Sequence, residues 1–146
     1  MPASPHLLVV RAPFYEDIIT ELTRGALQAL DAAGATYEII DVPGAFEIPA
    51  VVAMAEASSS AYDGYVALGC VIRGETTHYD YVCGESARGL QELAFRDRLA
   101  IGFGVLTCEN GEQAWARASV ERKNKGAEVA RAALHMIEVK RRFGQP

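Results

Sequence analysis

Four short apolar runs alternate along this chain with longer segments of helical periodicity, and this alternation limits the possible folds more than any other feature. A helical crossover joins strands that run in the same direction. The order therefore predicts one parallel sheet with right-handed crossovers and helices on both faces, which is a three-layer αβα sandwich of the α/β class. The four predicted strands cover residues 6–11, 36–42, 65–70 and 101–107.

Five segments are predicted to be helical, and several of them have recognisable ends. Ile18 and Leu22 lie on an apolar stripe that Gly34 ends, because glycine readily adopts the left-handed conformation that follows many helices. Pro49 suits the first turn of the next helix, and the serines from Ser58 onward end it. The predicted helices cover residues 16–33, 49–58, about 80–100, 109–118 and 124–143.

Length and charge narrow the classes of function. A chain of 146 residues suits one domain, residues 1–146, around a single core. The formal net charge of −5 argues against a nucleic-acid partner, since binding to the phosphate backbone requires a basic face. No apolar run approaches the roughly 20 residues that span a bilayer, and residues 1–6 are too short and polar for a signal peptide. We expect a cytoplasmic protein without a membrane partner and without disulfides, because its three cysteines show no paired spacing.

The polar segment of residues 71–80 is the strongest candidate for function. It follows the third predicted strand and precedes a helix, and ligands of open α/β sheets bind at this point, where helix N-termini offer unpaired N–H groups. It carries a guanidinium at Arg73, hydroxyls at Thr76 and Thr77, and an imidazole at His78. Proton transfer and anion binding are both chemically available to these groups. His78 could equally be an ordinary surface or core histidine, and Arg73 could equally be an ion-pair partner.

Aromatic and acidic side chains follow the first two predicted strands. Phe14 comes after the first strand, and Phe46 with Glu47 after the second. Because parallel strands end at one edge of a sheet, these residues and His78 could line a single pocket. The two rings could stack on a flat heterocycle or serve as ordinary packing residues. Glu47 could accept hydrogen bonds from a ligand or simply favour a helix N-terminus.

Two basic residues, Arg117 and Lys125, lie after the fourth predicted strand, around a break between two helices. Together they could bind a dianion such as phosphate, or they could belong to a solvated charged face. The sequence has no G-x-G-x-x-G or Walker pattern and no grouping typical of a metal site. We therefore expect neither a dinucleotide nor a bound metal.

Three segments, read together, closely resemble one enzyme family. They are residues 43–49 (PGAFEIP), 69–80 (GCVIRGETTHYD) and 124–126 (NKG), and they occur in the family's order over nearly the whole chain. On these motifs the chain is similar to the 6,7-dimethyl-8-ribityllumazine synthases. The resemblance implies a flavodoxin-like fold and a transferase of riboflavin synthesis that uses no metal or organic cofactor. Its two small-molecule substrates would be 5-amino-6-(D-ribitylamino)uracil and 3,4-dihydroxy-2-butanone 4-phosphate.

The resemblance also implies a role for each candidate residue. His78 matches the family's proton-transfer residue, and Phe103 matches the residue that covers the second face of the pyrimidine. Contacts with the pyrimidine and its ribityl chain are implied for Phe14, Ala45, Phe46, Glu47, Cys70, Val71 and Ile72. Contacts with the butanone phosphate are implied for Glu75, through its backbone N–H alone, and for Thr76, Arg117 and Lys125.

Family members are at least pentameric, so the resemblance implies a homo-oligomer of five subunits or a multiple of five. Phe103, Arg117 and Lys125 would come from the neighbouring subunit, and a functional link to a riboflavin synthase is implied as well. Pro13 and Cys70 depart from many members, which carry arginine and threonine there, and we expect these departures to affect affinity rather than activity. Two alternatives stay open: a flavin- or lumazine-binding protein without turnover, and a signalling domain of flavodoxin-like fold.

Overall fold

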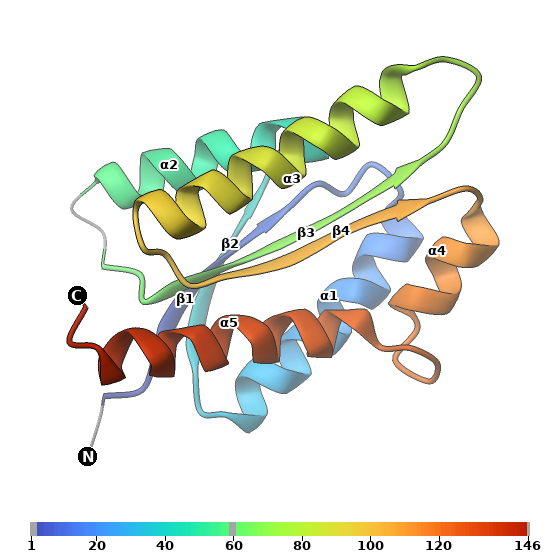
Figure 1. Ribbon diagram of the computed structural model, residues 1–146. Coiled ribbons are helices and arrows are strands. Elements are labelled where there is room, and N and C mark those ends of the chain that lie inside the picture. Colours follow the sequence, from blue (N-terminus) through green and yellow to red (C-terminus); the bar gives the residue numbers. More distant parts are fainter. Residues whose placement is uncertain (1–2, 59–60, 146) are drawn as a thin grey trace.

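The four predicted strands form one sheet in the computed structural model, which describes residues 3–58 and 61–145 (Figure 1). The strands are β1 (His6–Arg11), β2 (Thr36–Asp41), β3 (Gly64–Ile72) and β4 (Ile101–Cys108), in the spatial order β2-β1-β3-β4. All three pairings are parallel, so every strand ends at the same edge. The predicted four-stranded parallel sheet of an α/β, flavodoxin-like fold is confirmed.

Helices cover both faces of the sheet, as predicted. One face carries α2 (Ile48–Ala57) and α3 (His78–Arg96), and the other carries α1 (Glu16–Ala32), α4 (Gly111–Ala118) and α5 (Lys125–Arg142) (Figure 1). Alternate residues of β1 enter two separate cores. Leu7 and Val9 pack with residues of α1 and α5, whereas Leu8 and Val10 pack with residues of α2 and α3. Burial on both faces explains why β1 is an uninterrupted apolar run in the sequence.

The start of α5 packs directly on the backbone of α1. A Cβ atom on Gly126 would lie 2.0 Å from the carbonyl oxygen of Leu22 and 2.9 Å from the amide nitrogen of Ala26. No side chain fits at this crossing, so only glycine allows the two helices to approach so closely. The contact fixes the position of Lys125, the first residue of α5.

The third strand is longer than the sequence predicts. Val71 and Ile72, expected in the polar segment, continue β3 and pair with β4 as far as the Ile72–Cys108 pair. Both residues are β-branched and suit a strand. The loop between β3 and α3 is therefore confined to residues 73–77, which we call the β3–α3 loop.

Helix ends differ from the predictions by a few residues. α3 begins at His78 rather than at about residue 80. It ends at Arg96 rather than at residue 100, because Arg98 adopts a left-handed conformation with a φ of 57°. Gly34 follows α1 with a φ of 71°, as predicted. α4 begins at Gly111 because the side chain of Asn110 accepts a hydrogen bond from the backbone N–H of Gln113.

The second helix follows a single turn of 3-10 helix over Ala45–Glu47, begins at Ile48 and carries Pro49 in its first turn, as expected. It ends before Ser58, whereas Ser59 and Ser60 lie outside the described residues. The last helix, α5, begins one residue later than predicted, after a left-handed Asn124. Within residues 3–58 and 61–145, no helix is long and apolar enough to cross a membrane.

Candidate active site

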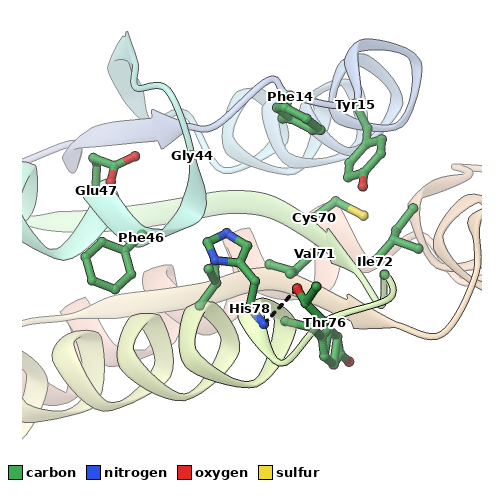
Figure 2. A pocket seen from close by; sticks show the side chains of 13 residues that line it. Phe14, Tyr15, Gly44, Phe46, Glu47, Cys70, Val71, Ile72, Thr76 and His78 are labelled. Atoms are coloured by element: carbon green, nitrogen blue, oxygen red, sulfur yellow. Dashed lines mark hydrogen bonds between the residues drawn. The ribbon is translucent and has the colours of Figure 1, made fainter.

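The loops that follow β1, β2 and β3 surround a pocket of about 490 Å³ at the carboxyl edge of the sheet, which we call the first pocket (Figure 2). This is the edge where open α/β sheets bind ligands. Phe14, Phe46, Glu47 and His78 all line it, although they are far apart in sequence. The full lining is Phe14, Tyr15, Gly44, Phe46, Glu47, Cys70, Val71, Ile72, Gly74, Thr76, His78, Tyr79 and Val82.

Phe14 and Phe46 are held at the pocket and not in the core. Their exposed fractions are 73% and 53%. Phe14 lies in the turn after β1, and Phe46 lies in the single 3-10 turn before α2. The ring of Phe14 stands nearly perpendicular to that of Tyr15, with 5.0 Å between the ring centroids. Exposed rings in a pocket offer a flat heterocycle a surface on which to stack. Neither ring therefore packs in the core of this chain.

The end of β3 forms a wall of the pocket through Cys70, Val71 and Ile72. Burial raises the pKa of the Cys70 thiol to about 12, so the thiol is protonated at neutral pH. A protonated thiol is a poor nucleophile and a poor metal ligand. Cys70 therefore contributes shape and apolar surface, as expected of a small buried hydrophobe. Like Cys83 and Cys108, it forms no disulfide.

His78 stands where the β3–α3 loop meets α3. Its backbone N–H donates to Thr76 Oγ1 at 3.4 Å, and Figure 2 shows its imidazole projecting into the pocket. The side chain is exposed, so it can exchange protons with a ligand. Thr77 occupies the N-cap position without a side-chain capping bond. The N–H groups of His78 and Asp80 in this first turn donate within the chain, to Thr76 Oγ1 and to the carbonyl oxygen of Thr77.

Arg73 is an ion-pair partner within its own chain, one of the two roles that the sequence allows. Its Nε donates to Glu109 Oε1 at 2.9 Å, and a terminal guanidinium nitrogen lies 3.7 Å from Asp80 Oδ1. The hydrogen bond with Glu109 is the main reason that the pKa of Arg73 is raised further. Arg73 does not line the first pocket, and the described residues that do line it include no lysine or arginine.

A second pocket of about 230 Å³ is lined by the two predicted basic residues, Arg117 and Lys125, and shares no lining residue with the first pocket. It brings together Phe103 on β4, Arg117 in the last turn of α4, and Lys125 at the start of α5. Lys125 Nζ pairs with Glu128 at 3.0 Å. Arg117 donates to the backbone oxygen of Gln113 at 3.0 Å, which leaves its charge uncompensated by that contact. Within one chain these three residues do not join the first pocket.

Two further predicted residues line neither pocket. Ala45 is buried in the core on the α2 and α3 side of the sheet, and Glu75 is exposed in the β3–α3 loop. A ligand in the first pocket could meet them only through their backbone groups or after movement of the loop.

The first pocket also contains residues that the sequence did not single out. Val82 lies one helical turn after His78, and this spacing puts both on one face of α3. That periodicity is a signal by which Val82 could be found. Tyr15, Gly44 and Gly74 adjoin predicted residues in loops and turns, and Tyr79 follows His78 in α3. Nothing in their residue types marks them as part of a pocket.

An open pocket at the carboxyl edge of a parallel sheet, with exposed aromatic rings and an imidazole, defines an α/β protein that handles a flat small molecule. Across the part of the chain that the structure describes, no group of three or more His, Cys, Asp or Glu side chains could hold a metal ion.

Comparison with known proteins identifies the family. The sequence model of 6,7-dimethyl-8-ribityllumazine synthase matches residues 4–141, and the chain belongs to this family. A 6,7-dimethyl-8-ribityllumazine synthase of Bartonella tribocorum is 56% identical over 99% of this chain and 95% of the relative. 6,7-Dimethyl-8-ribityllumazine synthase 1 of Rhizobium meliloti is 57% identical over 95% of this chain and 94% of the relative. The synthase of Agrobacterium fabrum is 55% identical over 97% and 99%.

Proposed function

We propose that this protein condenses 5-amino-6-(D-ribitylamino)uracil with 3,4-dihydroxy-2-butanone 4-phosphate to 6,7-dimethyl-8-ribityllumazine, the penultimate step of riboflavin synthesis. The amine attacks the ketone and loses water to form an imine, phosphate is eliminated, and the ring closes with loss of water. The proposal treats residues 1–146 as one lumazine synthase domain that works without a cofactor.

The composition of the first pocket is the observation that carries this proposal. Two exposed phenylalanines, a carboxylate and an imidazole surround one volume. The substrate pyrimidine is flat and carries N–H groups, so it can stack on Phe14 and donate hydrogen bonds to Glu47. We assign the pyrimidine and its ribityl chain to Phe14, Ala45, Phe46, Glu47, Cys70, Val71 and Ile72, with Ala45 contributing backbone groups.

His78 is the proposed proton-transfer residue. Every stage of the reaction moves protons between nitrogen, carbon and oxygen, and an imidazole can both accept and donate a proton. The side chain is exposed within the pocket, so it can reach a substrate bound there. Holding two substrates in the correct orientation supplies much of the remaining catalysis.

The phosphate of the second substrate needs positive charge that the described lining of the first pocket lacks. Thr76 and the backbone N–H of Glu75 can donate hydrogen bonds beside the start of α3, but they are neutral donors. We therefore assign the charge to the second pocket of a neighbouring subunit, with Arg117 as the main phosphate ligand and Lys125 in support. Phe103 of the same neighbour would cover the other face of the pyrimidine.

This arrangement requires a homo-oligomer, and we propose a pentamer or a multiple of five. Exposed apolar side chains support an assembly. Met54 on α2 and Tyr81 and Phe95 on α3 keep 68%, 68% and 66% of their surface exposed, and both helices cover the same face of the sheet. Apolar residues gathered in this way are suited to an interface between subunits. A riboflavin synthase that consumes the product and a cytoplasmic location stay predictions.

The proposal is tested by an assay of the purified protein with both substrates. Lumazine formation is followed by absorbance and fluorescence and compared with the rate of the uncatalysed reaction. Clear acceleration supports the proposed reaction. Tight binding of riboflavin without product formation would instead indicate a flavin- or lumazine-binding protein that does not catalyse the condensation.

A further inference from the structure

We propose that Arg73 is a positioning residue: it orders the β3–α3 loop and so places Thr76 and His78 for catalysis. This inference rests on the proposed function, because it gives Arg73 a part in that reaction. Arg73 does not line the first pocket, so its action has to pass through the residues that do.

The Arg73 side chain spans two elements that meet beside the pocket. Its backbone N–H donates to the carbonyl oxygen of Cys108 at 2.9 Å, which fixes the residue at the end of the β3–β4 ladder. Its Nε donates to Glu109 Oε1 at 2.9 Å, and a terminal nitrogen lies 3.7 Å from Asp80 Oδ1. The guanidinium carbon lies 4.4 Å from the centre of the Tyr79 ring, which is the geometry of a cation–π contact. Arg73 therefore ties the end of β4 to the first turn of α3.

The β3–α3 loop has few other restraints among the described residues. The loop is exposed, and no atom outside Gly74 and its two chain neighbours lies within 4 Å of the place that a Cβ would take on Gly74. Thr77 makes no side-chain capping bond, and Val82 is the first residue of α3 that is buried. The turn that carries His78 thus precedes the point at which α3 is anchored in the core. The contacts of Arg73 hold this turn against the end of the sheet, together with a side-chain hydrogen bond between Tyr79 and Thr107 on β4.

Direct binding of phosphate by Arg73 is the competing interpretation. Two carboxylates, Glu109 and Asp80, already face its guanidinium, whereas an arginine that binds an anion keeps its donors free for that anion. The cation–π contact also occupies one face of the guanidinium plane. A role in support of Thr76 and His78 agrees with these contacts, and a role as phosphate ligand would require breaking them.

Loss of Arg73 is expected to slow turnover without unfolding the protein. Exposed ion pairs contribute little to global stability, but displacing a catalytic group by about 1 Å can cost on the order of 10²-fold in rate. Arg73→Ala should lower kcat by about 10- to 100-fold and leave the KM of the pyrimidine within about twofold. Arg73→Lys should recover only part of the rate, because an ammonium group cannot bridge two carboxylates and also stack on a ring.

A double-mutant cycle with His78→Ala separates positioning from a general structural effect. If Arg73 acts through His78, then Arg73→Ala should slow the His78→Ala variant by less than about threefold, although it slows the wild type by about tenfold or more. Equal effects in the two backgrounds would overturn the proposal. A rise in KM confined to the phosphorylated substrate, with kcat unchanged, would also overturn it and would favour direct phosphate binding.

Hydrogen exchange gives a second readout that does not depend on activity. Amides of residues 74–81 should exchange faster in Arg73→Ala than in the wild type. They should be unchanged in the control Arg24→Ala, which removes an exposed ion pair with Glu21 on α1. Unchanged exchange in Arg73→Ala would overturn the proposal. A wild type that fails to accelerate the reaction would overturn the proposed function itself, whereas an active wild type with an equally active Arg73→Ala variant would overturn only the positioning role.

Discussion

His78 offers its imidazole to the first pocket from the first position of α3. His78→Ala should lower kcat by about 10²–10⁴-fold, the usual contribution of general acid–base catalysis, with a modest change in substrate binding. The rate of the uncatalysed reaction sets the lower limit to the rate that can be observed with His78→Ala. Steady-state kinetics with both substrates measure the effect, and His135→Ala is the matched control because His135 is exposed on α5 outside both pockets. Unchanged turnover in His78→Ala would exclude the residue from the reaction.

Asp41 and Arg11 join the carboxyl ends of β1 and β2. Arg11 donates to the two carboxylate oxygens of Asp41 at 2.8 and 2.9 Å, and this hydrogen bonding lowers the pKa of Asp41 against the opposing effect of burial. A carboxyl group whose pKa is depressed in the folded state stabilises the fold above its unfolded pKa. That contribution is lost as the pH falls through the folded value.

Asp41→Asn should therefore lower the free energy of unfolding at pH 7, and the difference from wild type should disappear in acid, below the ordinary Asp value of about 3.9. The side chain of Asp41 is 48% exposed, so the effect is limited to about 1 kcal/mol or less. Denaturant titrations at several pH values and one protein concentration measure it, with Asp97→Asn at the exposed end of α3 as control. A difference that persists at pH 2 would show that the ion pair is not its source.

The crossing of α1 and α5 can be tested at Gly126. Gly126→Ala should lower the free energy of unfolding by about 1–3 kcal/mol, the usual cost of overpacking, because the new methyl group would meet backbone atoms of α1. Gly84→Ala on α3 is the matched control. It has open space around the added Cβ and should stabilise the helix by up to about 1 kcal/mol. If denaturant unfolding shows the two variants to be equally stable, the crossing is looser than the structure indicates.

Periodicity in the sequence predicts the elements of this chain better than their ends. The bounds of β1 agree with the prediction, because a strand buried on both faces is an apolar run with polar neighbours. The prediction for β3 stops two residues early. Val71 and Ile72 are followed by a polar loop, and only the pairing with β4 decides that they belong to the strand. The prediction also starts α3 about two residues late, although threonine, the residue type at its N-cap position, often precedes a helix.

The candidate site could be predicted in part, for a geometric reason. Phe14, Phe46 and His78 converge because the ends of parallel strands share one edge, which follows from strand order alone. The separation of Arg117 from them does not follow from strand order. It depends on how α4 and α5 return along β4, the edge strand of the sheet. Residue type gives no sign that Tyr15 faces the pocket.

Two pockets with complementary chemistry in one chain predict that defective chains can rescue each other. Arg117→Ala alone should raise the KM of the phosphorylated substrate more than that of the pyrimidine, and His78→Ala alone should lower kcat. Mixed assemblies of the two variants should regain activity, because an intact His78 can then lie beside an intact Arg117 of the neighbour. Random mixing at equal amounts should restore about a quarter of the sites.

The measurement compares chains that are co-expressed or refolded together with the same two variants assembled separately and then combined. Native mass spectrometry establishes that the first sample contains mixed oligomers. Activity in the first sample and not in the second supports a site shared between subunits. Mixed oligomers that stay inactive would contradict that arrangement.

The separation of the two pockets also has a genetic consequence. In the proposed assembly, a chain that loses Arg117 keeps its own first pocket intact. It removes the phosphate ligand from the site that it shares with its neighbour, so the neighbour's first pocket becomes inactive. An allele defective in both His78 and Arg117, expressed beside an intact allele, would leave about a quarter of the sites active, compared with about half if each chain worked alone. Such an allele would be partly dominant, and the cell would lose more activity than the count of defective chains suggests.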